Sequence, residues 1–303
     1  MVEIKNVAIV GASGAIGEPI MKALVESGKF NVTVVKRPSS KASFPASVKV
    51  VSADTTSVES VTAAFEGQDA VVSTVGTEGL QGQQVLIDAA IAAGVKRFLP
   101  SEFGTDIANP KVGALPVFGY KIATQKYLQE ALAAKPGMTY TYVSNGAFLD
   151  WGLKNGFLLD TKDGKPTIYD GGKTVFSATT LASVGQAVVG VLSHYEETKN
   201  RCVYVRDIDI SQKRLLEIAQ KVAPEKKWEP VNVNTVDIEK SSNEGLARGE
   251  FTIPVMVGFI FRAIFGEGYG NKFEKDDNAL LGITGKTEAD VEAIFKALLA
   301  GGK

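Results

Sequence analysis

A glycine-rich loop directly after an apolar run is the feature that most restricts how this chain can fold. The run Val7–Val10 leads into Gly11, Gly14 and Gly17, and a helical pattern follows. In a dinucleotide-binding loop, the first glycine permits a tight turn, the second lets the backbone approach a pyrophosphate, and the third lets helix and strand pack closely. The loop is not a P-loop, because Glu18 stands where that motif needs a lysine.

The loop lies between a strand-like and a helical segment, and this context favours cofactor binding over a purely structural turn. Backbone N–H groups at a helix start point towards a bound phosphate, and the helix dipole favours negative charge there. We therefore expect the whole loop to contribute to a cofactor site, that is Gly11, Ala12, Ser13, Gly14, Ala15, Ile16 and Gly17.

Strand-like and helical patterns alternate through the first half of the chain. Short β-branched runs are typical of parallel strands covered on both faces, and apolar residues at three- and four-residue steps are typical of helices. The alternation predicts a Rossmann-type, doubly wound α/β domain over residues 1–150, binding the dinucleotide. Its expected strands are Val7–Val10, Val32–Val35, Val48–Val51, Ala70–Thr74, Arg97–Pro100 and Tyr140–Val143, and its expected helices are Ile16–Ser27, Val58–Phe65, Gln83–Ala93 and Lys121–Ala134.

The alternation weakens after Trp151, where turn-forming residues follow one another closely. We expect residues 151–303 to form a smaller, substrate-binding lobe. A helix at Leu181–Ser193 and a strand at Cys202–Val205 are expected to return to the first sheet, so that residues of about 174–210 rejoin the first domain. The charged run 196–200 is expected to be a solvated loop, and Ile253–Phe265 a buried or pocket-lining helix.

The end of the second expected strand indicates which dinucleotide binds. An NAD site usually has an acidic residue about 20 residues after the glycine loop to hold the ribose 2′-hydroxyl, whereas a 2′-phosphate needs cations. Here Lys36 and Arg37 occupy that position, and Lys41 follows. The planar guanidinium of Arg37 suits a phosphate, so NADP(H) is favoured. The alternative is that these residues are solvated charges at the end of a strand.

Composition removes several other classes of function. The chain has 33 basic and 34 acidic residues and a net charge of −1, so a nucleic-acid partner is not expected. Cys202 and His194 are single residues of their kinds, which excludes an internal disulfide and disfavours metal-centred or Ser-His-Asp chemistry. No apolar stretch approaches the ~20 residues that span a bilayer, and no signal peptide is recognisable, so we expect a cytoplasmic protein without a membrane partner.

Three segments carry a resemblance to a known family. They are Ser73–Gly76, Lys96–Gly104 (KRFLPSEFG) and Tyr140–Asn145. In order and spacing they resemble the isoflavone reductase-like group of atypical short-chain dehydrogenases, which belongs to the NmrA-like superfamily and includes phenylcoumaran benzylic ether, pinoresinol-lariciresinol and eugenol-forming reductases. The resemblance covers most of residues 5–180 and is faint beyond about residue 210.

The resemblance implies a set of site residues. The family's lysine at the start of the helix before the sixth strand aligns with Lys121, which would act in catalysis and contact the cofactor; the alternative is a surface lysine like Lys126. The alternative for Phe103 and Asn145 is a core or sheet-end position, and the alternative for Asp54 is a helix N-cap. The cofactor contacts that the resemblance implies are Asp54 beside the adenine, Thr74, Val75, Gly76, Phe103 and Asn145, with Lys41 as the nearest match to a second 2′-phosphate lysine.

This sequence also departs from the family pattern. Gln125 stands where the family often carries a basic residue, and Leu280–Gly285 replaces the Leu-Tyr-Pro segment of the plant enzymes. A plant phenylpropanoid substrate therefore does not transfer to this chain. At the helix that carries Lys121 the usual Tyr-x-x-x-Lys pair of short-chain dehydrogenases is missing, since Thr124 lies four residues after Tyr120, so catalysis would depend on Lys121 alone.

These observations lead to two hypotheses about function. The first is an NADPH-dependent reductase that transfers hydride to a small aromatic or conjugated substrate, a carbonyl, enone or quinone-methide-like carbon, with Lys121 handling the proton. The alternative is an NmrA-like regulatory protein that senses NADP(H) without turnover. The sequence leaves open the substrate, the direction in vivo and the oligomeric state, a homo-oligomer included.

Overall fold

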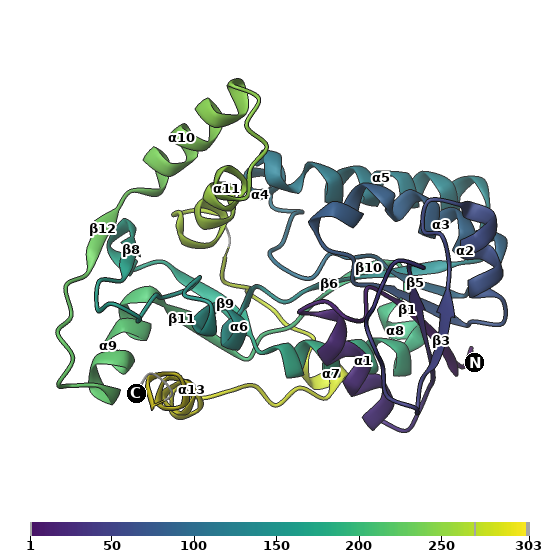
Figure 1. The fold of residues 1–303 in the computed structure, drawn as a ribbon, viewed down its shortest axis with the longest axis horizontal. Helices are drawn as coiled ribbons and strands as arrows, with labels where there is room; N and C mark the ends of the chain where they lie inside the picture. Colours follow the sequence, from purple (N-terminus) through teal and green to yellow (C-terminus); the bar gives the residue numbers. More distant parts are fainter. Residues whose placement is uncertain (1, 270, 301–303) are drawn as a thin grey trace.

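Seven parallel strands form the centre of the larger part of the molecule, as the computed structural model shows (Figure 1). The structure describes residues 2–269 and 271–300, apart from the side chains of residues 77 and 78. The strand order is β10-β6-β5-β4-β1-β2-β3, with every neighbouring pair parallel. The strands are β1 Asn6–Val10, β2 Asn31–Lys36, β3 Lys49–Ser52, β4 Ala70–Ser73, β5 Arg97–Leu99, β6 Thr139–Ser144 and β10 Arg201–Tyr204.

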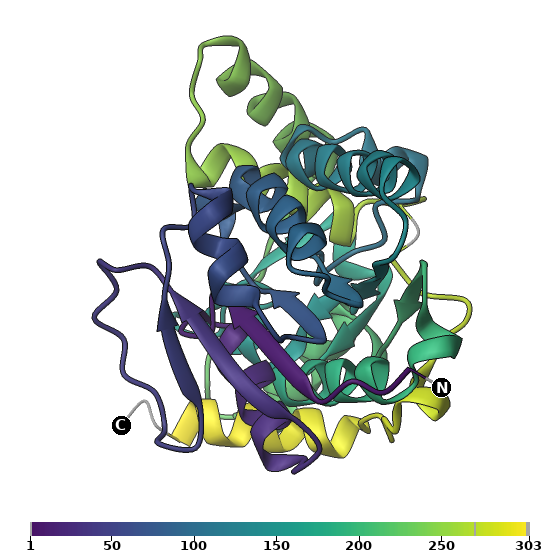
Figure 2. The ribbon, with the colours of Figure 1, turned by 90° about the vertical axis from the view of Figure 1, so that its right-hand side faces the viewer.

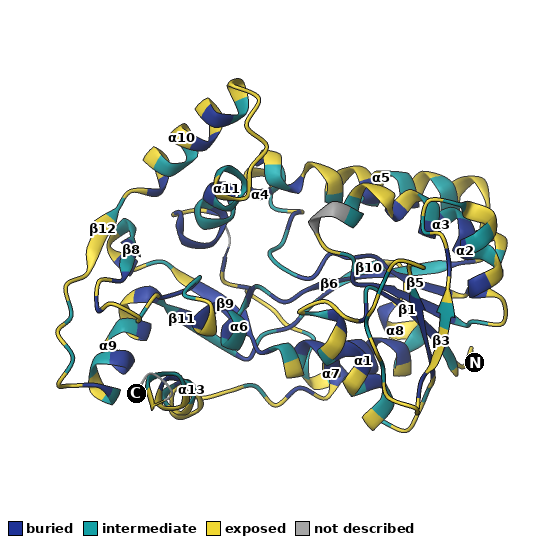
Figure 3. Cartoon of the chain, in the orientation of Figure 1, coloured by how far each residue is buried: buried dark blue, intermediate teal, exposed yellow. Residues whose placement is uncertain are grey.

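Helices cover both faces of this sheet (Figure 2). One apolar core joins α1 (Gly17–Glu26) and α7 (Leu181–Ser193) to one face, and a second joins α2 (Val58–Phe65), α3 (Gln83–Ala92) and α5 (Gly119–Ala134) to the other. The central strands are buried on both sides, which explains their continuous apolar runs (Figure 3). The predicted Rossmann-type, doubly wound α/β fold is confirmed.

The strand order reverses between β1 and β4, and in open parallel sheets ligands bind beyond the carboxyl ends of the strands at such a point. Three short elements lie in the connections that leave this edge after β4 and β5. They are η1 (Thr77–Gly82), α4 (Pro110–Gly113) and η2 (Pro116–Phe118). This edge is therefore where a ligand is expected to bind.

The rest of the chain builds a smaller lobe beside the carboxyl edge of the sheet (Figure 1). It has a three-stranded sheet of β7 (Ala147–Phe148), β9 (Val175–Thr179) and β11 (Ile208–Ser211), and a two-stranded sheet of β8 (Thr167–Tyr169) and β12 (Val231–Val233). No helix of the described residues is long and apolar enough to cross a membrane. The helices are α6 (Leu149–Lys154), α9 (Gln212–Val222), α10 (Thr235–Ala247), α11 (Ile253–Phe265) and α13 (Glu288–Ala300), and η3 (Asp170–Gly172) is a single turn.

After β9 the chain returns to the main sheet. There α7 packs against α1, β10 pairs in parallel with β6, and the short helix α12 (Asn278–Leu281) packs on α7. The prediction that 196–200 is a solvated loop is wrong for its first half, because Tyr195–Thr198 forms the helical turn α8. The cause is Arg97, whose buried guanidinium donates to the Thr198 hydroxyl at 2.9 Å and to the Tyr195 carbonyl at 2.6 Å.

Candidate active site

The backbone of the glycine loop requires two of its three glycines. Gly11 has a φ of 91°, which favours glycine, and a Cβ there would lie 2.7 Å from the carbonyl oxygen of Thr74. A Cβ on Gly17 would lie 2.1 Å from the carbonyl oxygen of Gly11. The protein's own packing therefore explains the first and third glycines without any ligand.

The middle glycine is different, because packing alone does not require it. A Cβ on Gly14 would meet only the Gly11 carbonyl oxygen, at 3.3 Å, and φ at Gly14 is outside the left-handed region. The N-terminus of α1 behind it has no side-chain cap, whereas Ser57 caps α2 and Thr180 caps α7. Open space at Gly14 and a helix N-terminus without a side-chain cap fit a pyrophosphate.

The cations at the end of β2 divide into two groups. The ammonium of Lys36 donates to the carbonyl oxygens of Ser40 at 3.2 Å and Ala42 at 3.4 Å, so this lysine holds its own loop together. Arg37 and Lys41 are exposed. Their positive charges, placed just beyond β2, are suited to a 2′-phosphate.

Asp54 lies at the end of β3 and is exposed. Its carboxylate accepts hydrogen bonds from the backbone N–H of Thr56 at 3.0 Å and the Thr56 hydroxyl at 2.7 Å, which lower its pKa. The helix N-cap considered as the alternative for Asp54 is wrong, because Ser57 caps α2. Asp54 therefore shapes the turn before the helix and keeps a charged carboxylate at the surface.

A buried glutamine at the start of α3, Gln83, is hydrogen-bonded to the end of β5, and the sequence reasoning missed it. The side-chain Oε1 of Gln83 accepts from the backbone N–H of Ser101 at 2.7 Å, and the Ser101 hydroxyl joins the ends of β5 and β4 by donating to the Val75 carbonyl at 2.8 Å. The Thr74 hydroxyl donates to the backbone of β1 at 2.9 Å, and Gly76 follows in an exposed, extended conformation. The sequence offered no signal for this role of Gln83, because its complete burial is known only from the folded structure.

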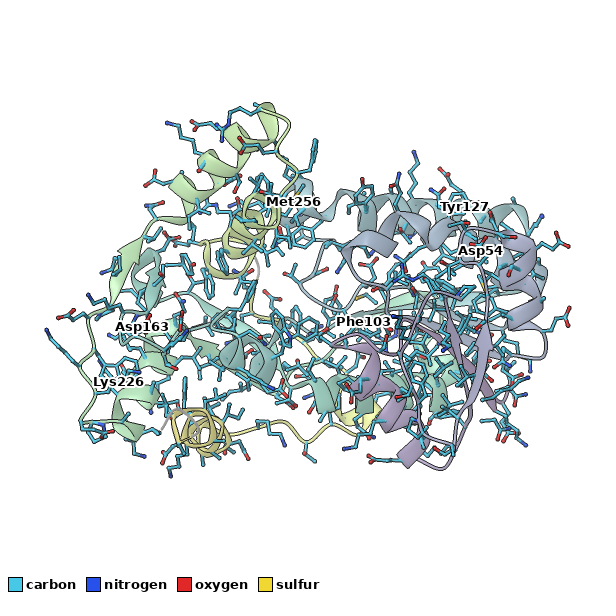
Figure 4. All side chains as sticks on the ribbon, in the orientation of Figure 1. Asp54, Phe103, Tyr127, Asp163, Lys226 and Met256 are labelled. Carbon is cyan, nitrogen blue, oxygen red and sulfur yellow. The ribbon has the colours of Figure 1, made fainter. Side chains whose placement is uncertain are left out.

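Lys121 comes from the first turn of α5 but reaches the end of β5. Its Nζ donates to the main-chain carbonyl oxygen of Glu102. The next residue, Phe103, is buried and lies near the middle of the molecule in Figure 4. Asn145, at the end of β6, donates its backbone N–H to the Gly104 carbonyl at 2.9 Å, and its buried Oδ1 has no partner among the described residues. The structure thus brings Lys121, Phe103 and Asn145 to one edge.

Two titratable groups in this region have perturbed pKa values. Desolvation lowers the pKa of Lys121, and the nearby Glu102 carboxylate opposes that shift. Burial raises the pKa of Glu102 to about 7, with Lys121 opposing. Glu102 is the second residue that the sequence reasoning missed; a charged side chain inside the apolar segment after β5 was the signal. Shifted titratable groups on a ligand-binding edge are typical of active sites.

Aromatic side chains of the smaller lobe form a continuous series of ring contacts. Phe157 lies between Trp151 and Phe261, with ring centroids 5.8 and 4.9 Å away, and Tyr169 lies 4.7 Å from Phe261. These four rings are partly exposed. Phe265, 4.8 Å from Tyr169, is almost fully buried and belongs to the core.

Fold and site together define a dinucleotide-binding α/β protein. Residues 11–195 match the family described as NAD(P)H-binding. The oxidoreductase poxI of Penicillium oxalicum is 34% identical over 302 residues, which cover 95% of this chain and 92% of that protein. The oxidoreductase aprR of Aspergillus flavus is 33% identical, with 98% and 99% of the two chains covered. The chain belongs to the NAD(P)H-binding family and is an oxidoreductase of the isoflavone reductase-like type.

Plant relatives and a solved structure agree with this assignment. The phenylcoumaran benzylic ether reductase TP7 of Nicotiana tabacum is 34% identical over 166 residues, 50% of this chain and 52% of that enzyme. A structure of AtPrR2 with NADP⁺ and (+)-pinoresinol superposes with a TM-score of 0.81 at 25% identity and covers 98% of this chain and 100% of the other.

Proposed function

We propose that the chain is an NADP(H)-dependent reductase that transfers hydride to a small aromatic or conjugated substrate, with Lys121 providing the proton. The acceptor would be a carbonyl, an enone or a quinone-methide-like carbon. The observation that carries the proposal is the position of the Lys121 ammonium on the Glu102 carbonyl, at the carboxyl edge of the sheet and close to Phe103. This edge adjoins the glycine loop, so one bound dinucleotide would reach both.

The cofactor contacts follow the edge of the sheet. The loop Gly11–Gly17 would hold the pyrophosphate, with Gly14 giving it room, and Arg37 and Lys41 would hold the 2′-phosphate. The NADP⁺ bound to the similar AtPrR2 structure supports this preference. Bound nicotinamide would supply the hydride. The remaining contacts would come from Asp54 on the adenine side and from Thr74, Val75, Gly76, Phe103, Lys121 and Asn145 on the nicotinamide side.

Lys121 would handle the proton that accompanies the reduction. Negative charge grows on the substrate oxygen as the hydride reaches carbon, and a nearby ammonium stabilises that charge and then donates its proton. The neutral amine afterwards takes a proton from water. The lowered pKa of Lys121 brings it closer to neutral pH, where a general acid is most effective.

The partly exposed rings of the smaller lobe would receive an aromatic substrate. Helix α11 connects the two regions: Phe259 packs into the core that contains Phe118, just before the helix of Lys121, while Phe261 joins the aromatic series. Aromatic rings stack favourably on such surfaces. The substrate would therefore lie between Lys121 and the rings of Trp151, Phe157, Tyr169 and Phe261.

The direct test is turnover by the wild-type chain. NADPH oxidation is followed by its absorbance on a panel of quinones, conjugated ketones and phenylpropanoid-like substrates, and NADPH deuterated at C4 shows whether the label moves to product carbon. We expect substrate-dependent oxidation with label transfer. Tight NADPH binding without oxidation anywhere on the panel would contradict the proposal and favour the NADP(H)-sensing alternative.

A further inference from the structure

The carboxyl group of Glu102 is the most unusual buried group near the candidate active site. Only 6% of the residue is exposed, at the end of β5. Four nearby residues interact with this carboxyl: Lys121 and Gln125 of α5, Tyr142 of β6 and Cys202 of β10. A buried carboxylate is unfavourable unless a cation or hydrogen-bond donors compensate its charge, so its partners decide its state.

The neighbouring groups compensate the negative charge of this carboxyl only in part. Its Oε1 is buried and has no hydrogen-bond partner in the part of the chain that the structure describes. Lys121 gives its hydrogen bond to the main-chain carbonyl of Glu102 and not to the carboxyl. Burial therefore raises the pKa of Glu102 to about 7, while Lys121 and the Gln125 side chain oppose this more weakly. The group changes charge in the neutral range.

The other titratable groups around Glu102 stay neutral in that range. Burial raises the pKa of the Cys202 thiol to about 11 and also raises the pKa of the Tyr142 phenol. Asp106 acts on Cys202 through its charge and accepts a hydrogen bond from the Tyr204 hydroxyl at 3.2 Å. Among the groups that face Glu102, only Lys121 therefore brings a charge that responds to it near neutral pH.

Burial shifts the pKa of Lys121 in the opposite direction to that of Glu102. It lowers the pKa of Lys121, and the charge of the Glu102 carboxylate raises it again. The negative charge of Glu102 therefore favours the protonated form of Lys121, and the positive charge of Lys121 favours the ionised form of Glu102. As the pH rises through neutrality, Glu102 ionises beside the Lys121 amine, whose proton the carboxylate charge favours. The new negative charge then holds that proton on Lys121.

We infer that Glu102 is a positioning residue that keeps Lys121 in its ammonium form above neutral pH. Its importance for turnover rests on the proposed role of Lys121 as proton donor. The charge link itself needs neither cofactor nor substrate, because both groups belong to the protein. The link can therefore be measured on the free chain.

The test measures the titration of the Lys121 amine in the absence of NADPH. The rate at which an amine-reactive acylating reagent modifies Lys121 is followed against pH by mass spectrometry of its peptide. In Glu102→Gln we expect the midpoint to fall by about one pH unit or more, since a nearby opposite charge commonly shifts a pKa by about 1 to 3 units. Glu102→Asp, which keeps a carboxylate, should recover part of the shift.

Glu130→Gln is the matched control, because Glu130 is an exposed carboxylate on the same helix. It should leave the Lys121 midpoint unchanged. An unchanged midpoint in folded Glu102→Gln would overturn the inference. A shifted midpoint in a protein that turns over no substrate would contradict only the proposed function.

A measurement on the wild-type chain guards against misfolding of the variants. With ¹³C-labelled glutamate, one carboxyl should titrate near pH 7, well above the other glutamates, and the Lys121 acylation profile should bend at the same pH. Absence of such a carboxyl would overturn the inference without any substitution. For turnover, the alkaline limb of kcat/KM should move down in Glu102→Gln by the same amount as the amine midpoint.

Discussion

The glycine loop and the Lys121 site lie on the same edge of one sheet but are built in different ways. The loop consists of seven consecutive residues and in the proposed function would offer a ligand mainly backbone N–H groups and the space left at Gly14. The Lys121 site joins a side chain of α5 to the ends of β5 and β6, and its charges depend on burial. A backbone site is encoded locally, whereas a charge site exists only after packing. Changes in the two regions should therefore have different effects.

Removing the charge of Lys121 should have the largest effect and should spare binding. Lys121→Met keeps an unbranched, apolar side chain but cannot donate a proton, so turnover should fall about 100- to 10,000-fold. NADPH affinity should change far less. Steady-state kinetics and a fluorescence titration measure the two effects. Lys126→Met, an exposed lysine on the same helix, is the control. Turnover retained by folded Lys121→Met would remove its assigned role.

Removing the charge of Arg37 should affect cofactor binding, which the Lys121 substitution spares. A charge-assisted hydrogen bond contributes about 1.5 to 3 kcal/mol, so Arg37→Ala should weaken NADPH binding roughly ten- to hundredfold and leave NADH binding nearly unchanged. Titration of both cofactors checks this, with Arg248→Ala at the exposed end of α10 as the control. Equal losses for NADPH and NADH would show that Arg37 does not recognise the 2′-phosphate.

The buried Glu102 carboxyl should appear in the pH dependence of stability. Its pKa rises from the ordinary 4.5 to about 7 in the folded chain, so the folded state holds a proton that the unfolded state has released. This contribution to stability is present below pH 4.5 and lost as the pH rises through 7, about 3 kcal/mol in all. Denaturant melts of wild type and Glu102→Gln measure it. The difference between the two should change across this window, and a constant difference would contradict the prediction.

Two alanine substitutions separate folding from binding within the loop. Gly17→Ala places a Cβ 2.1 Å from the Gly11 carbonyl oxygen and should cost about 1 to 3 kcal/mol of stability. Gly14→Ala meets only one contact, at 3.3 Å, and should melt almost like the wild type while losing affinity for both NADPH and NADP⁺. Thermal melts paired with calorimetric titration decide this. Undiminished binding by Gly14→Ala would mean that no pyrophosphate approaches that residue.

The smallest expected effect lies in the other lobe. Phe261→Leu removes one ring from the aromatic series at a partly exposed position, and an aromatic pair contributes about 0.5 to 1.5 kcal/mol beyond its area. The KM for an aromatic substrate should rise roughly two- to tenfold, with NADPH affinity unchanged. Phe44→Leu, a partly buried ring in the core of the α1 face, is the control. A change in NADPH affinity alone would place the cofactor, and not the substrate, beside this ring.

The local patterns of the sequence predicted several helices in both parts of the chain. The helices at Val58–Phe65, Leu181–Ser193 and Ile253–Phe265 have the predicted bounds. They were predictable because three- and four-residue apolar periodicity directly reflects which face of a helix is buried. The pairing of β8 with β12 was not predicted, since it joins Thr167 to Val231 and a short strand does not reveal its distant partner.

By itself, the sequence determined the turn of the glycine loop, the cations at the end of β2 and the alternation of strands and helices. Each depends on neighbouring residues and on steric rules that hold before the chain is packed. Only the tertiary structure decided the state of Glu102, the buried bonds of Arg97 and the attachment of Lys121 to the end of β5. These features depend on desolvation and on contacts between residues far apart in the chain, and neither exists until the sheet and its helices have come together.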